Sequence, residues 1–464
     1  MTVLSLFANY ERGLLRLPAV IRAMGCAGFL SGLLLPAAAA PAPAIAPAYH
    51  SVHYAGSAQA GELRIGVTYT VWIPPGVTTL RGVIVHQHGC GEDACKGGAT
   101  AACDLHWQAL ARKQECALLG PSYEQSAKDD CHLWCDPRNG SDQRFQQALA
   151  DLAAQSQHPE LETVPWALWG HSGGGDWVGA MLMLHPDRIA AVWVRSSAPP
   201  FADEWKTLTG SEIPAAAYAV PVMCNLGTQE GVTVKTGPFA VVWGIVQSYF
   251  KEFRGQGGLI GVAVDPNSSH DCGNSRYLAI PWLDACLTAR LPEKAGDANL
   301  KPMPTADAWL APLLGHEAQP AANFTGDKRA AVWLPNARIA KAWAEYEKDG
   351  EVSDPTPPPA PTQVRISAAG ELSWEAEADL ESGIAAFVIE RDGVEIARIP
   401  GKTSGYFVGR PAFQQIGYGD TPASPLTSMR YTDPLAKSRG SHTYAVRTLN
   451  TAGLKSEPGP ATKG

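Results

Sequence analysis

Short apolar runs recur along the first two thirds of the chain, and helix-length segments separate them. The runs include VIVH, VPWALWG, IAAVWVRS, VPVMCNLG and LIGVAVDP. Near-continuous apolar strands of this kind are typical of a parallel sheet that helices cover on both faces. The pattern therefore predicts an α/β domain over residues 49–350, with its core at 66–291 and a mixed extension at 291–350.

Residues 363–464 follow a different pattern. The segments GELSWEA, AAFVIERDGVEIARIP and HTYAVRTLNTAG alternate apolar and polar residues, with turn residues between them. This alternation predicts a small antiparallel β-sandwich. The proline-rich residues 351–362 precede it and favour an extended spacer. We therefore expect two parts, each with its own core and few contacts to the other.

The N-terminus has the pattern of an export signal. Arg12, Arg16 and Arg22 precede an apolar stretch at 23–35, and small residues follow it. The stretch is shorter than the roughly 20 residues that a membrane-spanning helix needs. This predicts a signal peptide over residues 1–40 and a secreted or periplasmic protein, with a retained anchor as the alternative.

Charge and cysteine content narrow the class further. The net charge of −8 is not concentrated in runs, which argues against a nucleic-acid partner. Six of the ten cysteines lie between Cys90 and Cys135, and in an exported protein this density predicts at least two disulfides of undetermined pairing. Cys131, His132 and Cys135 are an alternative metal set. No second ligand pair follows at zinc-site spacing, so we predict no metal.

The strongest chemical motif is G-x-S-x-G at residues 170–174, with Ser172 at its centre. It follows an apolar strand directly and opens a helix. Such a turn forces the central residue into strained backbone angles and lifts its hydroxyl to the edge of the sheet, next to a helix N-terminus that favours negative charge. Ser172 is therefore the predicted nucleophile.

These features resemble the α/β-hydrolase fold over about residues 66–291. The stretch HPELETVPWALWGHSGGG is similar to secreted esterases related to polyhydroxybutyrate depolymerases. The C-terminal part resembles a fibronectin type III domain, with Trp374 and Tyr444 at that family's tryptophan and tyrosine positions. A long insert at 414–431 departs from the compact fibronectin pattern.

The resemblance implies a triad in the order serine, acid, histidine. His270 follows a predicted strand where the family has its base. Glu230 ends the preceding strand, where the family has its acid; Asp265 and Asp203 are the alternative acids.

The resemblance also implies an oxyanion hole. Its amides are those of Gly173 and of Cys90, which follows the His88-Gly89 pair. His86 and His88 are interpreted as shaping this loop rather than as a metal pair, and a disulfide at Cys90 would stiffen it.

The predicted function is hydrolysis of carboxylic esters through an acyl-enzyme, without a cofactor. Polyesters and plant cell-wall acyl esters are candidate substrates; a peptidase and a non-catalytic binding protein are the alternatives. The C-terminal part is interpreted as a spacer or as a binder of an insoluble polymer or glycan. Residues 200–219 are a candidate lid. Four aromatic residues are candidates for either the substrate cleft or the core: Tyr123, Trp134, Trp177 and Trp205.

Overall fold

A computed structural model describes residues 48–266, 268–401, 410, 412–425, 429–436 and 441–463. The predicted signal peptide, with Cys26, lies outside these residues. Among the helices of the described ranges, none is long and apolar enough to cross a membrane.

An eight-stranded sheet forms the centre of the first domain, in the order β1-β2-β4-β3-β5-β6-β7-β8. β2 runs antiparallel to both of its neighbours, and β4, β3 and β5 to β8 are parallel. Every residue of β3 and of β5 to β8 is buried, which explains the near-continuous apolar runs. The predicted α/β-hydrolase-like mixed sheet is therefore present. Its strands are β1 (Tyr49–Tyr54), β2 (Val67–Trp72), β3 (Gly82–Gln87), β4 (Cys116–Tyr123), β5 (Trp166–His171), β6 (Ile189–Arg195), β7 (Val222–Gly227) and β8 (Ile260–Asp265).

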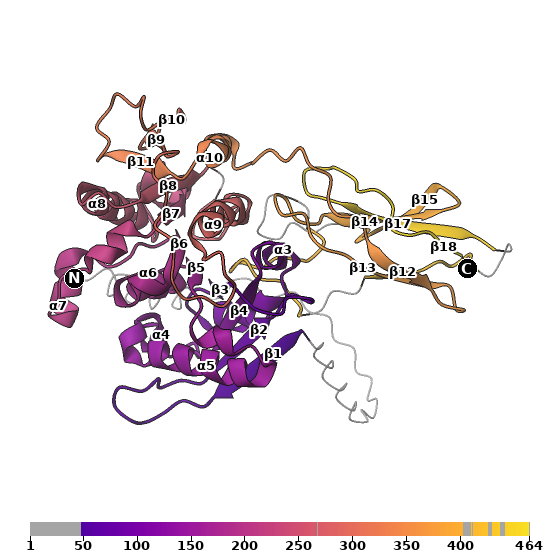
Figure 1. Cartoon of the computed structure of the whole chain (residues 1–464), viewed down its shortest axis with the longest axis horizontal. Helices are drawn as coiled ribbons and strands as arrows, with labels where there is room; N and C mark the ends of the chain where they lie inside the picture. Colours follow the sequence, from indigo (N-terminus) through magenta and orange to yellow (C-terminus); the bar gives the residue numbers. More distant parts are fainter. Residues whose placement is uncertain are drawn as a thin grey trace, which may run out of the picture.

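Helices cover both faces of this sheet. In Figure 1, α3, α9 and α10 lie on one side, and α4, α5, α6 and α8 lie on the other. α6 contacts β5 and β6, and it is buried almost all round, so its position is fixed by packing. The helices are α2 (Glu92–Gly98), α3 (Leu105–Lys113), α4 (His132–Cys135), α5 (Ser141–Ser156), α6 (Gly173–Leu184), α7 (Ala202–Thr209), α8 (Val241–Gly255), α9 (Arg276–Arg290) and α10 (Ala337–Asp349).

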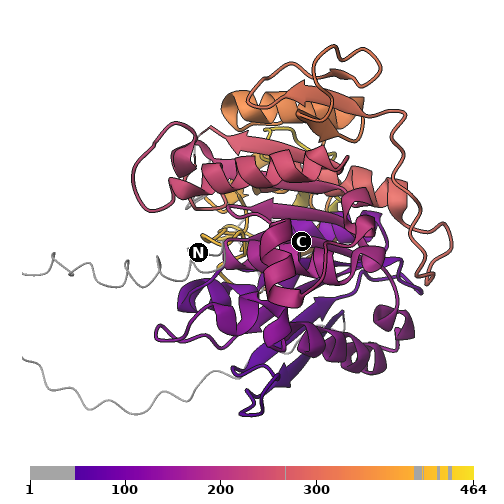
Figure 2. The same ribbon diagram turned by 90° about the vertical axis from the view of Figure 1, so that its left-hand side faces the viewer.

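The mixed extension covers the β8 edge of the sheet. It forms a small antiparallel sheet of β9 (Trp309–Pro312), β10 (Gln319–Pro320) and β11 (Ala331–Leu334), followed by α10 (Figure 2, orange). The Trp343 indole in α10 donates to the Val262 carbonyl at 2.7 Å. Gly350 ends α10 in the left-handed conformation that glycine adopts readily at the end of a helix.

The C-terminal region contains two antiparallel sheets with a core of their own, as predicted. Trp374 and Tyr444 lie in that core. The fibronectin type III assignment itself stays a prediction. One sheet has the order β12-β13-β16 and the other β15-β14-β17-β18. The strands are β12 (Thr362–Ile366), β13 (Glu371–Glu375), β14 (Ala386–Arg391), β15 (Val394–Ile399), β16 (Arg430–Thr432), β17 (Thr443–Leu449) and β18 (Thr462–Lys463).

The expectation of few contacts between the two parts is wrong. Residues 412–422, which we call the docking segment, run from the sandwich core, where Phe413 packs, to the core of the sheet domain, where Ile416 packs (Figure 1, yellow coil near α3 and β4). The Gln414 side chain accepts from the Leu105 amide at 2.8 Å and donates to the Cys103 carbonyl at 2.9 Å. Thr100 donates to the Pro422 carbonyl at 2.6 Å. The proline-rich linker alone does not separate the domains, because this second connection joins them.

Candidate active site

Ser172 occupies a strained turn between β5 and α6. Its φ of 53° and ψ of −123° lie outside the regions that side chains prefer. The turn also leaves no room for side chains two residues away. A Cβ on Gly170 would lie 2.2 Å from the Gly174 carbonyl oxygen, and one on Gly174 would lie 2.3 Å from the His88 carbonyl oxygen. The glycines of the motif are therefore required by packing.

The structure brings Ser172, His270 and Glu230 together in one hydrogen-bonded chain. His270 Nε2 lies 2.9 Å from Ser172 Oγ, and His270 Nδ1 lies 2.7 Å from Glu230 Oε1. Their exposed fractions are 5 %, 4 % and 0 %. Because a carboxylate only accepts, it fixes the proton of neutral His270 on Nδ1 and leaves Nε2 to accept the serine proton.

The local backbone explains how a glutamate serves at the acid position. Glu230 lies in a short π-helical turn, Thr228–Val232, with non-helical angles of φ −92° and ψ 36°. This turn directs the longer side chain back toward the end of β7. There its Oε2 accepts from the Ser196 hydroxyl and from the Gly227 amide, both at 2.8 Å. These donors compensate the carboxylate for its burial.

The alternative acids lie elsewhere. Asp265, at the end of β8, accepts from the Asn274 amide at 2.9 Å. Asp203 is exposed on α7. Glu230 is the carboxylate placed against the His270 imidazole.

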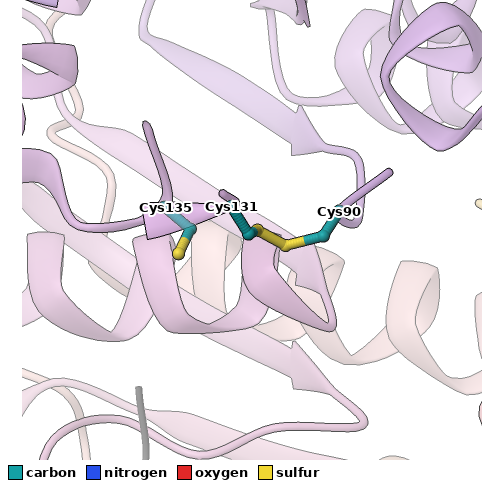
Figure 3. Close-up of side chains that lie close together, drawn as sticks. All are labelled: Cys90, Cys131 and Cys135. Carbon is teal, nitrogen blue, oxygen red and sulfur yellow. A yellow bond between two sulfur atoms is a disulfide. The ribbon is translucent and has the colours of Figure 1, made fainter. Parts of the chain in front are cut away.

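Cys90 and Gly173, the two residues predicted to supply the oxyanion amides, lie next to each other. A Cβ on Gly173 would come within 2.0 Å of Cys90 Sγ and 2.6 Å of Cys131 Sγ. Cys90 and Cys131 form a disulfide (Figure 3). The distances to Gly173 show that this disulfide packs on it. The bridge at Cys90, considered from the sequence, is thus present, and it ties the Cys90 loop to α4 beside the nucleophile turn.

The disulfide involves Cys131, which is one residue of the alternative metal set Cys131, His132 and Cys135. The sulfurs of Cys90, Cys131 and Cys135 lie within 4.8 Å of one another. Cys131 is joined to Cys90, and a disulfide sulfur is not the thiolate that a zinc ion binds.

The predicted minimum of two disulfides exceeds what the structure describes, which is the single Cys90–Cys131 bridge among the described residues. Other cysteines are buried as small apolar side chains of the core. Cys116 lies in β4 and Cys224 in β7, both 0 % exposed, and burial raises the pKa of each thiol to about 12. Cysteine density therefore overestimated cross-linking, because part of it reflects core packing.

His88 shapes the loop that carries Cys90, as predicted. Burial lowers the pKa of the His88 imidazole to about 4, so the ring is neutral at pH 7. Its Nδ1 donates to the Gly89 carbonyl at 2.7 Å, and its Nε2 accepts from the Tyr123 amide at 3.4 Å.

Arg195, which the sequence reasoning missed, holds the loop that carries His270. We call residues 268–275 the histidine loop. Arg195 donates to the Ser268 hydroxyl at 2.7 Å and to the Asp271 carbonyl at 3.0 Å. Burial alone would lower the pKa of this guanidinium, but Glu230 and other acidic groups hold it above its usual value. The signal in the sequence was an arginine at the end of an apolar run, where a charged side chain is rarely buried without partners.

Three further residues contact His270. Phe239 stacks on its imidazole with ring centroids 3.8 Å apart. His171 Nε2 donates to the His270 carbonyl at 2.6 Å, and the Tyr418 hydroxyl donates to the same oxygen at 2.8 Å. Tyr418 belongs to the docking segment, and 148 positions separate it from His270, so no local sequence signal pointed to it.

The four candidate cleft aromatics lie in the core instead, and this corrects the cleft interpretation. Tyr123 and Trp134 stack on each other at 4.6 Å, and Trp134 donates to the Gln125 side chain. Trp177 donates to the Ser141 hydroxyl, and Trp205 is buried within α7. All are at most 4 % exposed, because strand β4 and helices α4, α6 and α7, which carry them, pack within the sheet domain.

Comparisons with known proteins give structural neighbours only. No family model matches the chain, and no curated protein matches it. A thermostable esterase shares 12 % identity, with 47 % of this chain and 54 % of that chain covered and a TM-score of 0.31. A siderophore hydrolase from Aspergillus nidulans shares 13 %, covering 52 % and 93 %, with a TM-score of 0.32. A cold-adapted esterase from an Arctic metagenome shares 12 %, covering 51 % and 92 %, with a TM-score of 0.33.

These neighbours are esterases and serine hydrolases. The chain spans about half the length of the thermostable esterase. At such low identities and TM-scores the likeness indicates nothing about the reaction that this chain catalyses.

Proposed function

We propose that this protein is a serine hydrolase that cleaves carboxylic esters. The observation that carries the proposal is the chain Ser172–His270–Glu230 at a strand-to-helix turn, with distances of 2.9 and 2.7 Å. A serine hydroxyl is a weak nucleophile by itself, and an adjacent base that a carboxylate orients is what activates it.

In the proposed acylation, Ser172 Oγ adds to the ester carbonyl carbon and His270 Nε2 takes the serine proton. Glu230 stabilises the resulting imidazolium. The amides of Cys90 and Gly173 donate to the oxyanion. The tetrahedral intermediate then collapses, the bond to the leaving oxygen breaks, and His270 gives that oxygen its proton to release an alcohol.

Deacylation repeats the same steps with water. His270 takes a proton from water, the resulting hydroxide adds to the acyl carbon, and Ser172 leaves with the proton from the imidazolium. The net reaction is ester plus water to acid plus alcohol. Because the triad supplies every proton transfer, the reaction requires no cofactor.

The wider setting of the proposal rests on sequence features. The predicted signal peptide and the Cys90–Cys131 disulfide support a secreted or periplasmic location. Polyesters and plant cell-wall acyl esters remain candidate substrates, and an insoluble polymer or glycan remains a candidate partner of the C-terminal sandwich. A peptidase with the same triad is the second candidate.

The test is hydrolysis of a short p-nitrophenyl ester by the wild type and by Ser172→Ala. We expect Ser172→Ala to lower kcat by roughly 10⁴–10⁶-fold with an unchanged circular dichroism spectrum. Ser248→Ala, on the exposed face of α8, is the matched control and should keep full activity. A variant at Ser172 that keeps a tenth of the activity would exclude it as nucleophile. Faster cleavage of peptide anilides than of esters would favour the peptidase.

A further inference from the structure

The docking segment reaches the backbone of the catalytic histidine. The Tyr418 hydroxyl donates to the His270 carbonyl at 2.8 Å, and the Cys272 amide donates to the Tyr418 carbonyl at 3.4 Å. The Tyr418 ring also meets His171 edge-on, with centroids 5.2 Å apart. A residue of the C-terminal region thus holds two points of the histidine loop.

Asp420 anchors this segment in the sheet domain. It is 1 % exposed. Its carboxylate accepts from Arg276 Nε at 2.7 Å, from Trp107 Nε1 at 2.9 Å and from His86 Nε2 at 3.3 Å. Although burial opposes ionisation, Arg276 and His86 hold the pKa of Asp420 below its usual value. A charge buried this deeply needs these partners, so the segment and the sheet domain stabilise each other.

Arg276 connects the anchor to the site. It is the first residue of α9, directly after the histidine loop. Its guanidinium also bonds Asp104 at 2.7 Å. The docking segment therefore holds the middle of the histidine loop through Tyr418 and the residue that follows the loop, Arg276, through Asp420.

We propose that Tyr418 is a positioning residue for His270, and that the docking segment of the C-terminal region completes the active site. This rests on the proposed function. The histidine loop joins β8 to α9 without regular structure, so side-chain contacts determine its position. Two donors, His171 Nε2 and the Tyr418 hydroxyl, meet on the His270 carbonyl and hold the backbone from which the imidazole reaches Ser172.

The two donors differ in what their loss would do. His171 is buried beside the nucleophile, so its replacement would disturb the turn itself. Tyr418 is 37 % exposed, and its hydroxyl can be removed while the ring stays in place. The Tyr418 hydroxyl donates to the backbone carbonyl of His270 and not to its imidazole, so this hydroxyl acts on catalysis through geometry.

The test compares Tyr418→Phe with the wild type in the full chain. We expect kcat on a p-nitrophenyl ester to fall about 3- to 30-fold with KM changed less than about twofold, because the base is less well placed while substrate binding is untouched. Inactivation by a fluorophosphonate, which also needs the activated serine, should slow by a similar factor. The melting temperature should stay within about 2 °C, as expected for loss of one partly exposed hydrogen bond.

Tyr54→Phe is the matched control. Tyr54 lies on the edge strand β1, and its hydroxyl bonds Asp151, so the variant also loses one tyrosine hydrogen bond but away from the triad. It should leave kcat and the inactivation rate unchanged. Asp420→Asn tests the anchor: it should lower kcat as Tyr418→Phe does and also lower the melting temperature.

The outcomes separate this inference from the proposed function. A wild type that neither hydrolyses esters nor reacts with the fluorophosphonate contradicts the proposed function. An active wild type with an equally active Tyr418→Phe overturns the positioning role. A Tyr418→Phe variant that loses activity only in proportion to a lower melting temperature and a higher KM also overturns it, because that is the behaviour of a structural contact.

Discussion

Glu230 and Asp420 are both buried carboxylates that support the surroundings of His270, and they do so in different ways. Glu230 comes from the end of a sheet strand and bonds the imidazole directly. Asp420 comes from a distant region of the chain and bonds Arg276, Trp107 and His86. In the proposed mechanism the first orients the imidazole that takes the serine proton, whereas the second joins the sandwich to the sheet domain. The comparison shows that burial of a charged group does not by itself identify a catalytic acid; the partner does.

The comparison is tested most strongly at Glu230. Glu230→Gln keeps the shape but removes the charge that stabilises the imidazolium. We expect kcat to fall about 10²–10⁴-fold with a nearly unchanged melting temperature.

Asp265→Asn, at the end of the neighbouring strand β8, is its control and should retain most of the activity. If Asp265→Asn or Asp203→Asn causes the large loss and Glu230→Gln does not, Glu230 is the wrong acid.

Removal of the C-terminal region tests the contribution of Asp420 and the docking segment to the active site. A chain that ends at Gly350 loses Tyr418 and Asp420 and leaves Arg276 and His86 with fewer partners in the core. We expect kcat/KM on a soluble ester to fall at least about tenfold, with a lower melting temperature, since loss of one partner of a buried charge typically costs about 3–5 kcal/mol.

Full activity of the shortened chain on soluble esters would contradict this prediction. That result is expected if the sandwich is independent of the sheet domain and only the linker connects them. A further loss confined to an insoluble polyester would indicate that the sandwich also binds the polymer.

Glu347 is a third buried carboxylate. It is buried in α10 and accepts from the Val264 amide at 2.9 Å, and burial raises the pKa of its carboxyl to about 8. Because the pKa of Glu347 is higher in the folded protein than in the unfolded one, its contribution to the free energy of unfolding is complete below the unfolded pKa, near 4.5. That contribution is lost as the pH rises toward 8.

Glu347→Gln should therefore gain stability relative to the wild type between pH 5 and pH 8, by roughly 1–3 kcal/mol at most. Urea unfolding at both pH values measures this. A difference that is constant with pH would show that Glu347 titrates normally.

The sequence predicted the sheet, the grouping of Ser172, Glu230 and His270, and the loop of Cys90 because their signals are local. Ser172 lies in a five-residue motif, and Glu230 and His270 each follow an apolar strand, so the common edge of the sheet brings them together. Tyr418 and Asp420 could not be predicted in this way. Their partners lie more than a hundred positions away, and the proline-rich linker favoured separate domains.

The sequence left open whether the aromatic residues line a cleft or the core, and it overestimated the number of disulfides, for a related reason. Trp134 and Trp177 are large aromatic side chains of a kind found both in substrate clefts and in cores. Only the packing of the folded chain distinguishes the two positions. Cys116 was counted toward disulfides, although a buried strand accepts cysteine as a small apolar residue.

The most direct test of the central claim is the site of reaction with a fluorophosphonate. Peptide mass spectrometry of the treated full-length protein should find one phosphonyl adduct, on Ser172, and the adduct should be absent from Ser172→Ala and formed much more slowly in Glu230→Gln. A folded protein that forms no adduct, or forms it on another serine, would contradict the account.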